Sequence, residues 1–164
     1  KNLYLVQRGN YQFTHCTVAT YSSNFIDHKD PVLTLSDFAN NNSNILDAQF
    51  RNCIFWGENK KGDSSEVVIQ KRGSNTFNVT FAHSLWKVFG TPANINTPVA
   101  MITNQPRFDS INTSKNYYDF RLKALPVPSP AINNGAVVAG ITTDLDGKPR
   151  QLGSAPDIGC FEKQ

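Results

Sequence analysis

The stretch QFRNCIFWGE, residues 49–58, decides the fold because it fits neither regular template. A flat strand alternates its side chains between two faces, so it cannot direct Phe50, Cys53 and Phe55 to the same side. A helix would have to accommodate the run Cys-Ile-Phe-Trp and would then meet Gly57, a poor helix former. The stretch therefore predicts two short strands that meet at a change of direction.

The same pattern occurs three times along the chain. It reads Phe, any residue, Asn or His, a small residue, any residue and an apolar residue. The three copies are FTHCTV (13–18), FRNCIF (50–55) and FAHSLW (81–86). Their unequal spacing indicates a fixed structural unit whose copies are joined by loops of different lengths.

The third position of each copy, His15, Asn52 or His83, is where we expect the chain to turn. Asn and His are among the non-glycine residues that most readily adopt a left-handed backbone conformation. One such residue resets the alternation, so that side chains before and after the corner all point inward. The inward ladders are then Phe13, Phe50 and Phe81; Cys16, Cys53 and Ser84; and Val18, Phe55 and Trp86.

Stacked corners of this kind place like residues about 4.8 Å apart on neighbouring strands. Ladders of like side chains stabilise coiled parallel strands. The sequence therefore predicts an all-β fold, a right-handed parallel β-helix of about three to four rungs over residues 1–103, with further strands in 2–7, 44–50 and 76–81. An antiparallel sandwich also uses short alternating strands, but it does not explain a bend residue at the same place in each copy.

The last part of the chain, residues 104–164, does not repeat the motif. Within it, YYDFRL (117–122) alternates like a strand with one polar face, and APDIGCFE (155–162) is expected to form a short last strand. Stacked coils expose sheet at each end and need a dissimilar terminal unit to cover it. We therefore expect 104–164 to be an irregular C-terminal cap of the same domain, after a proline-containing loop or degenerate rung at 89–108.

Composition limits the class of protein. A chain of 164 residues with 39% hydrophobic and 18% charged residues is typical of one globular domain. The net charge is only +3, with small basic clusters at 59–61 and 70–72, which argues against a nucleic-acid partner. No apolar run reaches the roughly 20 residues of a transmembrane helix. The chain starts with strand-like alternation rather than a signal peptide, so we interpret it as a piece of a longer protein.

Few residues are candidates for metal binding. The three cysteines form no CxxC pair, so we expect free thiols rather than zinc or a disulfide framework. Asp144 and Asp146, before Gly147, are weak candidates for a calcium loop, but Gly153 stands where the bidentate acid is needed. Asp-Gly is also typical of an ordinary hairpin turn. No cofactor is expected.

The candidates for sugar binding are aromatic. Trp56, Tyr117 and Tyr118 are weak candidates that could stack on a sugar ring if they face solvent, the alternative being that they pack beneath a loop. Glycan cleavage would need carboxylates paired across a groove. The outward positions of the three corners supply no such pair, and we expect no catalytic residue in this chain; those positions are Thr14, Thr17, Arg51, Ile54, Ala82 and Leu85.

Two parts of the sequence carry a resemblance to a known family: the rung at 50–57 and the tail YDFRL…SPAINNG…TDLDGKPR…PDIGCFE at 118–162. They resemble the C-terminal portion of right-handed β-helix proteins of the pectate-lyase-like superfamily, common among secreted and surface proteins of Bacteroidetes-type bacteria. The tail departs from the usual Gly-Ala-Tyr-Glu ending at Cys160 and Phe161.

The resemblance implies an extracytoplasmic, secreted or cell-surface protein associated with polysaccharide, and it implies no particular activity. We expect a structural or glycan-associated module that is not catalytic within this chain. The alternative is the stabilising C-terminal part of a polysaccharide lyase or glycoside hydrolase whose catalytic residues lie upstream. A surface for protein adhesion is a third interpretation. The oligomeric state is left open.

Replacement of Asn52 by Val tests the predicted corner. We expect Asn52→Val to lower the free energy of unfolding by about 1–3 kcal/mol, because a β-branched residue resists the left-handed conformation. Thr14→Val, at an outward strand position, should be nearly silent. Chemical denaturation of both variants measures the difference, and equal losses at the two sites would contradict the corner.

Overall fold

The computed structural model describes residues 3–39, 42–58 and 65–163. The basic cluster at 59–61 lies outside these residues. Within them the chain is all-β and contains no helix, and so none that could cross a membrane. The fold is built from sets of strands that repeat along the sequence.

Each repeat is one winding of three strands. The first winding consists of β1 (Leu3–Val6), β2 (Gly9–Thr14) and β3 (Thr17–Tyr21). The second consists of β4 (Leu33–Ser36), β7 (Leu46–Arg51) and β8 (Ile54–Glu58). The third consists of β9 (Val67–Gln70), β10 (Phe77–Ala82) and β11 (Leu85–Trp86). A small antiparallel pair, β5 (Phe38–Ala39) and β6 (Asn42–Ser43), projects between β4 and β7.

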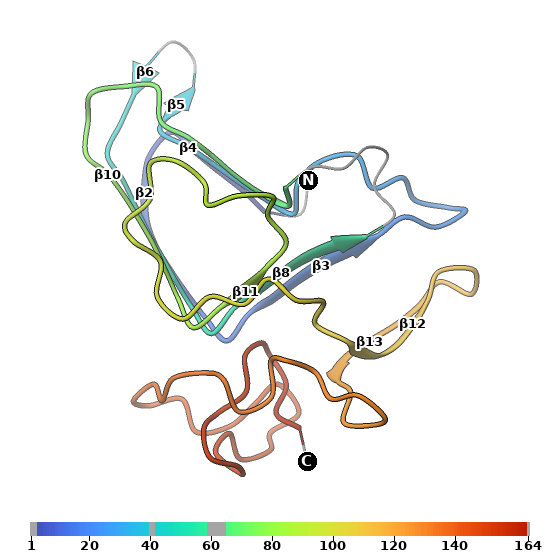
Figure 1. The fold of residues 1–164 in the computed structure, drawn as a ribbon. Helices are drawn as coiled ribbons and strands as arrows, with labels where there is room; N and C mark the ends of the chain where they lie inside the picture. Colours follow the sequence, from blue (N-terminus) through green and yellow to red (C-terminus); the bar gives the residue numbers. More distant parts are fainter. Residues whose placement is uncertain (1–2, 40–41, 59–64, 164) are drawn as a thin grey trace.

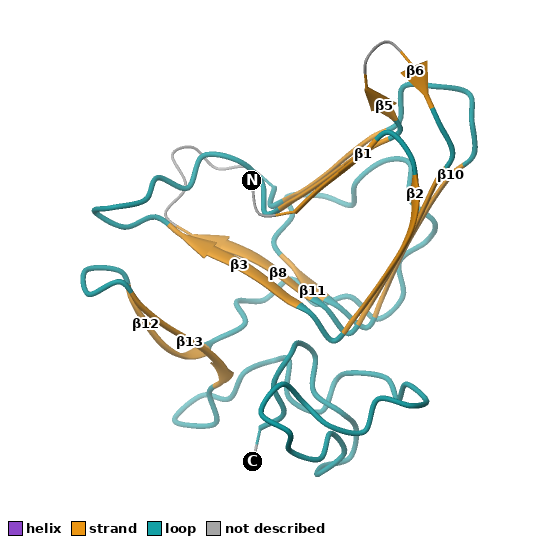
Figure 2. Cartoon of the chain, turned by 180° about the vertical axis from the view of Figure 1, so that it is seen from behind, coloured by secondary structure: helices purple, strands orange, loops and turns teal. Residues whose placement is uncertain are grey.

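Equivalent strands of successive windings pair with one another in three parallel sheets. The orders are β1-β4-β9, β10-β7-β2 and β11-β8-β3, and the sheets form three sides around a common interior (Figures 1 and 2). The register is uninterrupted, so Phe13 pairs with Phe50 and Phe50 with Phe81. This stacking of parallel three-strand sets is compatible with a β-helix and excludes the antiparallel sandwich.

The corner between the second and third side has the geometry that the sequence predicts. His15, Asn52 and His83 have positive φ angles of 52°, 56° and 47°. The aromatic residues before the corner stack in the interior, with ring centroids of Phe50 lying 5.2 Å from Phe13 and 4.7 Å from Phe81. Phe55 and Trp86 after the corner belong to the same apolar core.

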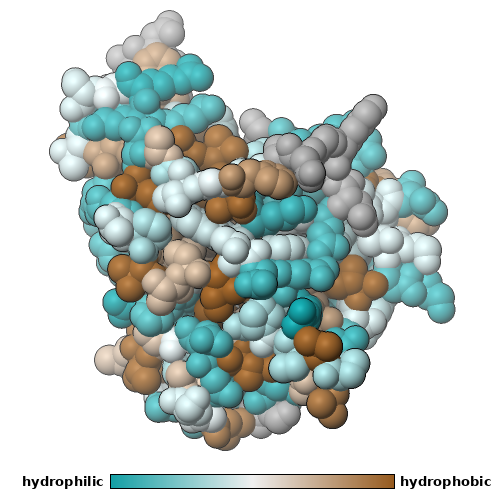
Figure 3. Space-filling model, in the orientation of Figure 1, coloured by the Kyte–Doolittle hydropathy of each residue, from teal (hydrophilic) through white to brown (hydrophobic). Residues whose placement is uncertain are grey.

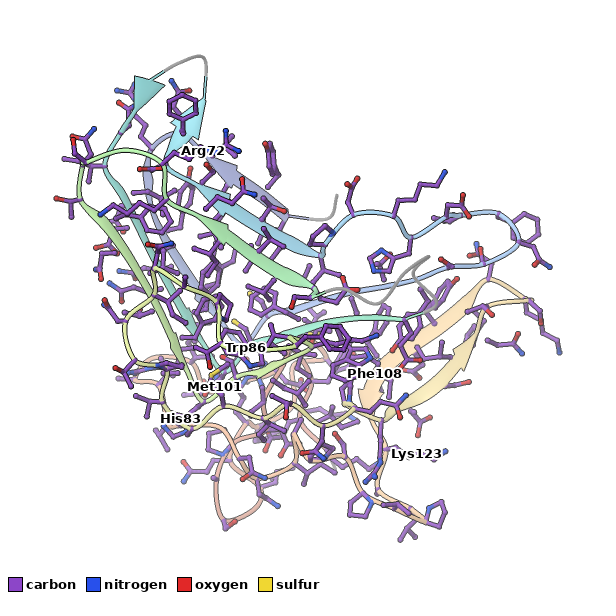
Figure 4. All side chains as sticks on the ribbon, turned by 45° about the horizontal axis from the view of Figure 1, so that its top comes forward. Arg72, His83, Trp86, Met101, Phe108 and Lys123 are labelled. Carbon is purple, nitrogen blue, oxygen red and sulfur yellow. The ribbon has the colours of Figure 1, made fainter. Side chains whose placement is uncertain are left out.

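Residues 88–102 cover the end of the stack beside the third winding. Asn96 donates its backbone N–H to the carbonyl of Val79 at 2.9 Å, and short parallel bridges join Val99 to Ala82 and Ile102 to Leu85. Apolar side chains of this segment, Met101 among them, pack on the interior core, and Figure 4 shows Met101 close to Trp86. The segment expected to be a loop or a degenerate rung therefore covers this end of the stack, joined to it by isolated bridges.

The segment 104–163 lies along one side of the coil rather than across its end, which differs from the expected cap (Figure 1). The hairpin of β12 (Phe108–Asn112) and β13 (Tyr117–Leu122) and the irregular chain after it pack on the outer face of β3, β8 and β11. The reason is the outward pair Ile54 and Leu85, both completely buried. Parallel sheets usually have apolar residues on both faces, and this side needs a second layer.

The strand predicted at 117–122 is confirmed as β13, whereas the last strand expected at 155–162 is wrong. The chain there makes single contacts with the coil instead: Gly159 donates its N–H to the carbonyl of Asn52 at 2.8 Å, and Cys160 donates to the hydroxyl of Thr17 at 3.2 Å. Its apolar residue Ile158 completes the layer outside the sheet. Gly159 has a φ of 101°, which strongly favours glycine.

Truncation of the stacked phenylalanines tests the interior ladder. Phe50 lies between two other rings and is 1% exposed, so Phe50→Ala should cost about 3–5 kcal/mol. The matched control is Phe13→Ala, at the half-buried end of the ladder, which should lower the free energy of unfolding clearly less. Urea denaturation of both variants checks this, and a larger loss at Phe13 would contradict the stacking.

Candidate functional site

A groove of about 660 Å3 opens between the ends of β3 and β8 and the β12–β13 hairpin. The coil and the segment around the hairpin both supply polar residues to its lining, among them Tyr21, Glu58, Gln105, Arg107, Asp109 and Lys123. Figure 3 shows one face of the molecule, on which hydrophobic and hydrophilic residues are interspersed. Figure 4 places Lys123 at the C-terminal end of the hairpin, with Phe108 nearer the coil.

Tyr21 and its aromatic neighbours form the buried side of the groove. Its ring stacks against Tyr118 and Phe120, with centroids 6.1 Å and 6.4 Å away. Burial, and then the negative charge of Glu58, raise the pKa of the Tyr21 phenol. The hydroxyl therefore keeps its proton at neutral pH.

The charged groups of the groove differ in how firmly they are held. One oxygen of Glu58 accepts hydrogen bonds from the indole N–H of Trp56 at 2.9 Å and from the amide of Gln105 at 2.6 Å. By contrast, no residue of the described ranges forms a hydrogen bond or ion pair with the side chains of Asp109 and Lys123. The groove thus offers a fixed carboxylate together with an acidic and a basic group that are free to meet a ligand.

The three weak aromatic candidates for sugar binding do not share a surface. Trp56 is only 6% exposed, which agrees with the packed alternative: the C-terminal segment packs on this side of β8, and the ammonium of Lys87 lies 5.8 Å from the ring. Tyr117 is 55% exposed at the start of β13, and Tyr118 faces the aromatic cluster of Tyr21. Trp56 contributes to the groove only indirectly, because its indole N–H donates a hydrogen bond to the carboxylate of Glu58.

The corner residue Asn52 is completely buried and joins three parts of the chain. Its backbone N–H donates to Ala82 of the next winding at 3.1 Å, and its carbonyl accepts from Gly159. Its side-chain Nδ2 donates to the ring of His15 at 2.8 Å and to the carbonyl of Ala136 at 2.7 Å. Its Oδ1 accepts the N–H of Ala136 at 2.9 Å. Every polar group of this residue is used.

The hydrogen bond from Asn52 determines which ring nitrogen of His15 carries the proton. Because the amide nitrogen of Asn52 donates, Nε2 of His15 must accept, and the neutral ring carries its proton on Nδ1. That Nδ1 is buried without a hydrogen-bond partner among the described residues. Burial, and then the positive charge of Arg150, lower the pKa of His15 from 6.5 to about 4. The predicted corner histidine is thus a neutral structural residue at pH 7.

The two weak calcium candidates are engaged in other interactions. Asp144 accepts the backbone N–H groups of Asp146, Lys148 and Glu162. Burial alone would raise the pKa of Asp144, but these donors together lower it. The carboxylate of Asp146 instead pairs with Arg121 at 2.8 Å and 2.9 Å. Across the described residues no three His, Cys, Asp or Glu side chains converge on a metal position.

Arg150 is the buried cation of the C-terminal segment. Its Nη1 and Nη2 donate to the carbonyls of Gly159 and Cys160 at 3.0 Å and 2.9 Å, and Glu162 lies 4.0 Å away. Burial raises the pKa of Glu162 to about 7, against the opposing effect of Arg150. The irregular chain after β13 is thus held by Arg150, by the Arg121–Asp146 pair and by carboxyl groups that accept backbone N–H groups.

A second buried polar pair, His28 with Glu66, was not found from the sequence. Nε2 of His28 lies 2.9 Å from a carboxylate oxygen of Glu66, and the second oxygen accepts the N–H of Val32 at 3.2 Å. Both side chains pack against Gly57, where a Cβ atom would collide with them. The pair ties the β3–β4 connection to the start of β9. Neither residue belongs to the repeated motif, so no sequence signal marked it.

No family model, curated protein or solved structure matches the chain.

The pH dependence of stability tests the environment of His15. Its pKa is about 4 in the fold against 6.5 ordinarily, so the unfolded chain takes up the proton first. The contribution of His15 is present above pH 6.5 and is lost as the pH falls to 4, by at most about 1.4 kcal/mol per pH unit. Glu162 acts oppositely: its raised pKa contributes stability below its ordinary 4.5 that is lost as the pH rises through about 7.

The variant His15→Asn separates the pH dependence that comes from His15 from that of Glu162. Asn is accommodated there because it occupies the equivalent corner of the second winding. The stability of this variant relative to the unchanged protein should rise as the pH falls from 6.5 to 4. Urea midpoints at pH 4.5, 5.5 and 6.5 measure this difference. A difference that does not vary with pH would show that His15 titrates normally.

Proposed function

We propose that the chain is the C-terminal part of an extracytoplasmic right-handed parallel β-helix protein and acts as a non-catalytic, glycan-associated module. Crossover connections between parallel strands of one sheet are right-handed in about 98% of cases, which supports the hand of the winding. The three in-register sheets and their left-handed corners support the architecture. The sequence resemblance supports the location and the association with polysaccharide.

The groove beside β12 and β13 is the observation that carries the glycan proposal. A sugar presents apolar C–H faces together with hydroxyls that both donate and accept hydrogen bonds. The groove combines apolar lining from Ile111 and Val127 with the carboxylate of Glu58 and the charged side chains of Asp109 and Lys123. A volume of about 660 Å3 is of the size typical of small-molecule sites.

The outward face of β2, β7 and β10 supports a role without catalysis. Asp47 lies between Asn10 and Asn78 in the register, and Asn78 donates to its carboxylate at 2.7 Å. The neighbouring windings thus place amides beside this acid, whereas hydrolysis across this face would require a second carboxylate. The groove holds two carboxylates, Glu58 and Asp109, and of these Glu58 is fixed by two hydrogen bonds.

Binding to a panel of neutral and acidic oligosaccharides tests the proposal. We expect at least one member to bind, and Lys123→Met to weaken that binding about tenfold, equivalent to about 1.4 kcal/mol. Lys71→Met is the matched control, because Lys71 adjoins Arg72 on the far side of the coil from Lys123 (Figure 4). It should leave binding unchanged.

Three results would contradict the proposal. Absence of binding across the panel would remove the glycan association. Equal losses in the two lysine variants would indicate nonspecific charge attraction rather than the groove. New reducing or unsaturated ends formed by the protein, and abolished by Glu58→Gln, would replace the non-catalytic role with an enzyme.

A further inference from the structure

Two of the three cysteines lie directly above one another at the corner. Cys16 and Cys53 each follow the left-handed residue of their winding, and the strands on both sides pair Thr14 with Arg51 and Thr17 with Ile54. The thiol of Cys53 lies 3.5 Å from the carbonyl of Phe13 in the first winding, which places its sulfur between the two windings.

From this register we infer that Cys16 and Cys53 form a reversible disulfide that links the first and second windings, and that the pair reacts with small-molecule disulfides. Neighbouring strands lie about 4.8 Å apart, within the range of about 4.4–6.8 Å between Cα atoms that a disulfide spans. Both are free thiols in this structure. The inference is independent of the glycan proposal, since neither thiol lines the groove.

The two thiols have different environments, and this assigns their roles. Cys16 is half-buried on the first winding, whose strands β2 and β3 are edges of their sheets. A hydrogen bond from Cys53 lowers the pKa of the Cys16 thiol to about 7, against the effect of burial. Cys53 is completely buried, and burial raises its pKa. Cys16 is therefore the attacking thiolate and Cys53 the resolving thiol.

The reaction is a pair of thiol–disulfide exchanges. The Cys16 thiolate attacks one sulfur of a small disulfide, forms a mixed disulfide and releases one small thiolate. Cys53 then loses its proton and attacks the Cys16 sulfur, and the second small thiolate leaves. The two cysteines lose two electrons and two protons in total, and the small disulfide is reduced to two small thiols.

The third cysteine is placed differently. Cys160 belongs to the C-terminal segment, and its backbone N–H donates to the hydroxyl of Thr17, an outward residue of β3. Burial raises the pKa of its thiol. It lies on the other side of the chain from the interior ladder, so we expect it to stay reduced.

Oxidised glutathione at pH 7 tests the inference on the folded chain. Mass spectrometry of the product should show the loss of two hydrogen atoms, and peptide mapping should find Cys16 linked to Cys53. Cys160→Ser should not change this result. A bond that involves Cys160, or full retention of all three thiols, would overturn the inference.

Serine variants separate the two roles. Ser84 occupies the equivalent position of the third winding and is completely buried there, so the fold accommodates serine at this position. Cys53→Ser should retain glutathione on Cys16 as a stable mixed disulfide, and Cys16→Ser should slow the reaction at least tenfold. Equal reactivity of the two variants would show that the pair does not act in sequence.

Discussion

The left-handed corner at Asn52 is the constraint on which the rest of the structure depends. With a φ of 56° and a buried side chain, this residue turns the second winding and at the same time hydrogen-bonds the first winding through His15 and the C-terminal segment through Ala136. An amide suits this position because it supplies two donors and an acceptor in one plane. His83 provides the same turn for the third winding without these side-chain bonds.

The corner also explains why the protein has two apolar layers. It resets the alternation of side chains, so that Phe50 and Phe55 both face the interior while Ile54 faces outward. The outward apolar residues of β8 and β11 require the hairpin and the irregular tail, and the tail brings buried polar groups such as Arg150 close to the corner. The groove lies where the hairpin faces the ends of β3 and β8, at Tyr21 and Glu58.

The repeated motif made the windings predictable, because few residue types other than glycine tolerate the left-handed conformation and because Phe13, Phe50 and Phe81 recur before it. The position of the tail was harder to predict. Ile54 and Leu85 were visible as outward apolar residues, and they were the signal that a second layer covers this side and buries Trp56. The groove gave no local signal, since Tyr21, Glu58 and Lys123 are far apart in the sequence. His28 and Glu66 meet only because two connections of different lengths converge.

The corners of the coil differ in how long a connection between strands they can accommodate. At the corner formed by residues 15, 52 and 83, consecutive strands are separated by only two residues, and the hydrogen-bonded stack leaves no space for an insertion. The connections from β3 to β4 and from β8 to β9 are much longer and differ from each other. Longer loops are therefore accommodated at the other two corners, where they would change the outline of the molecule without shifting the stacked strands.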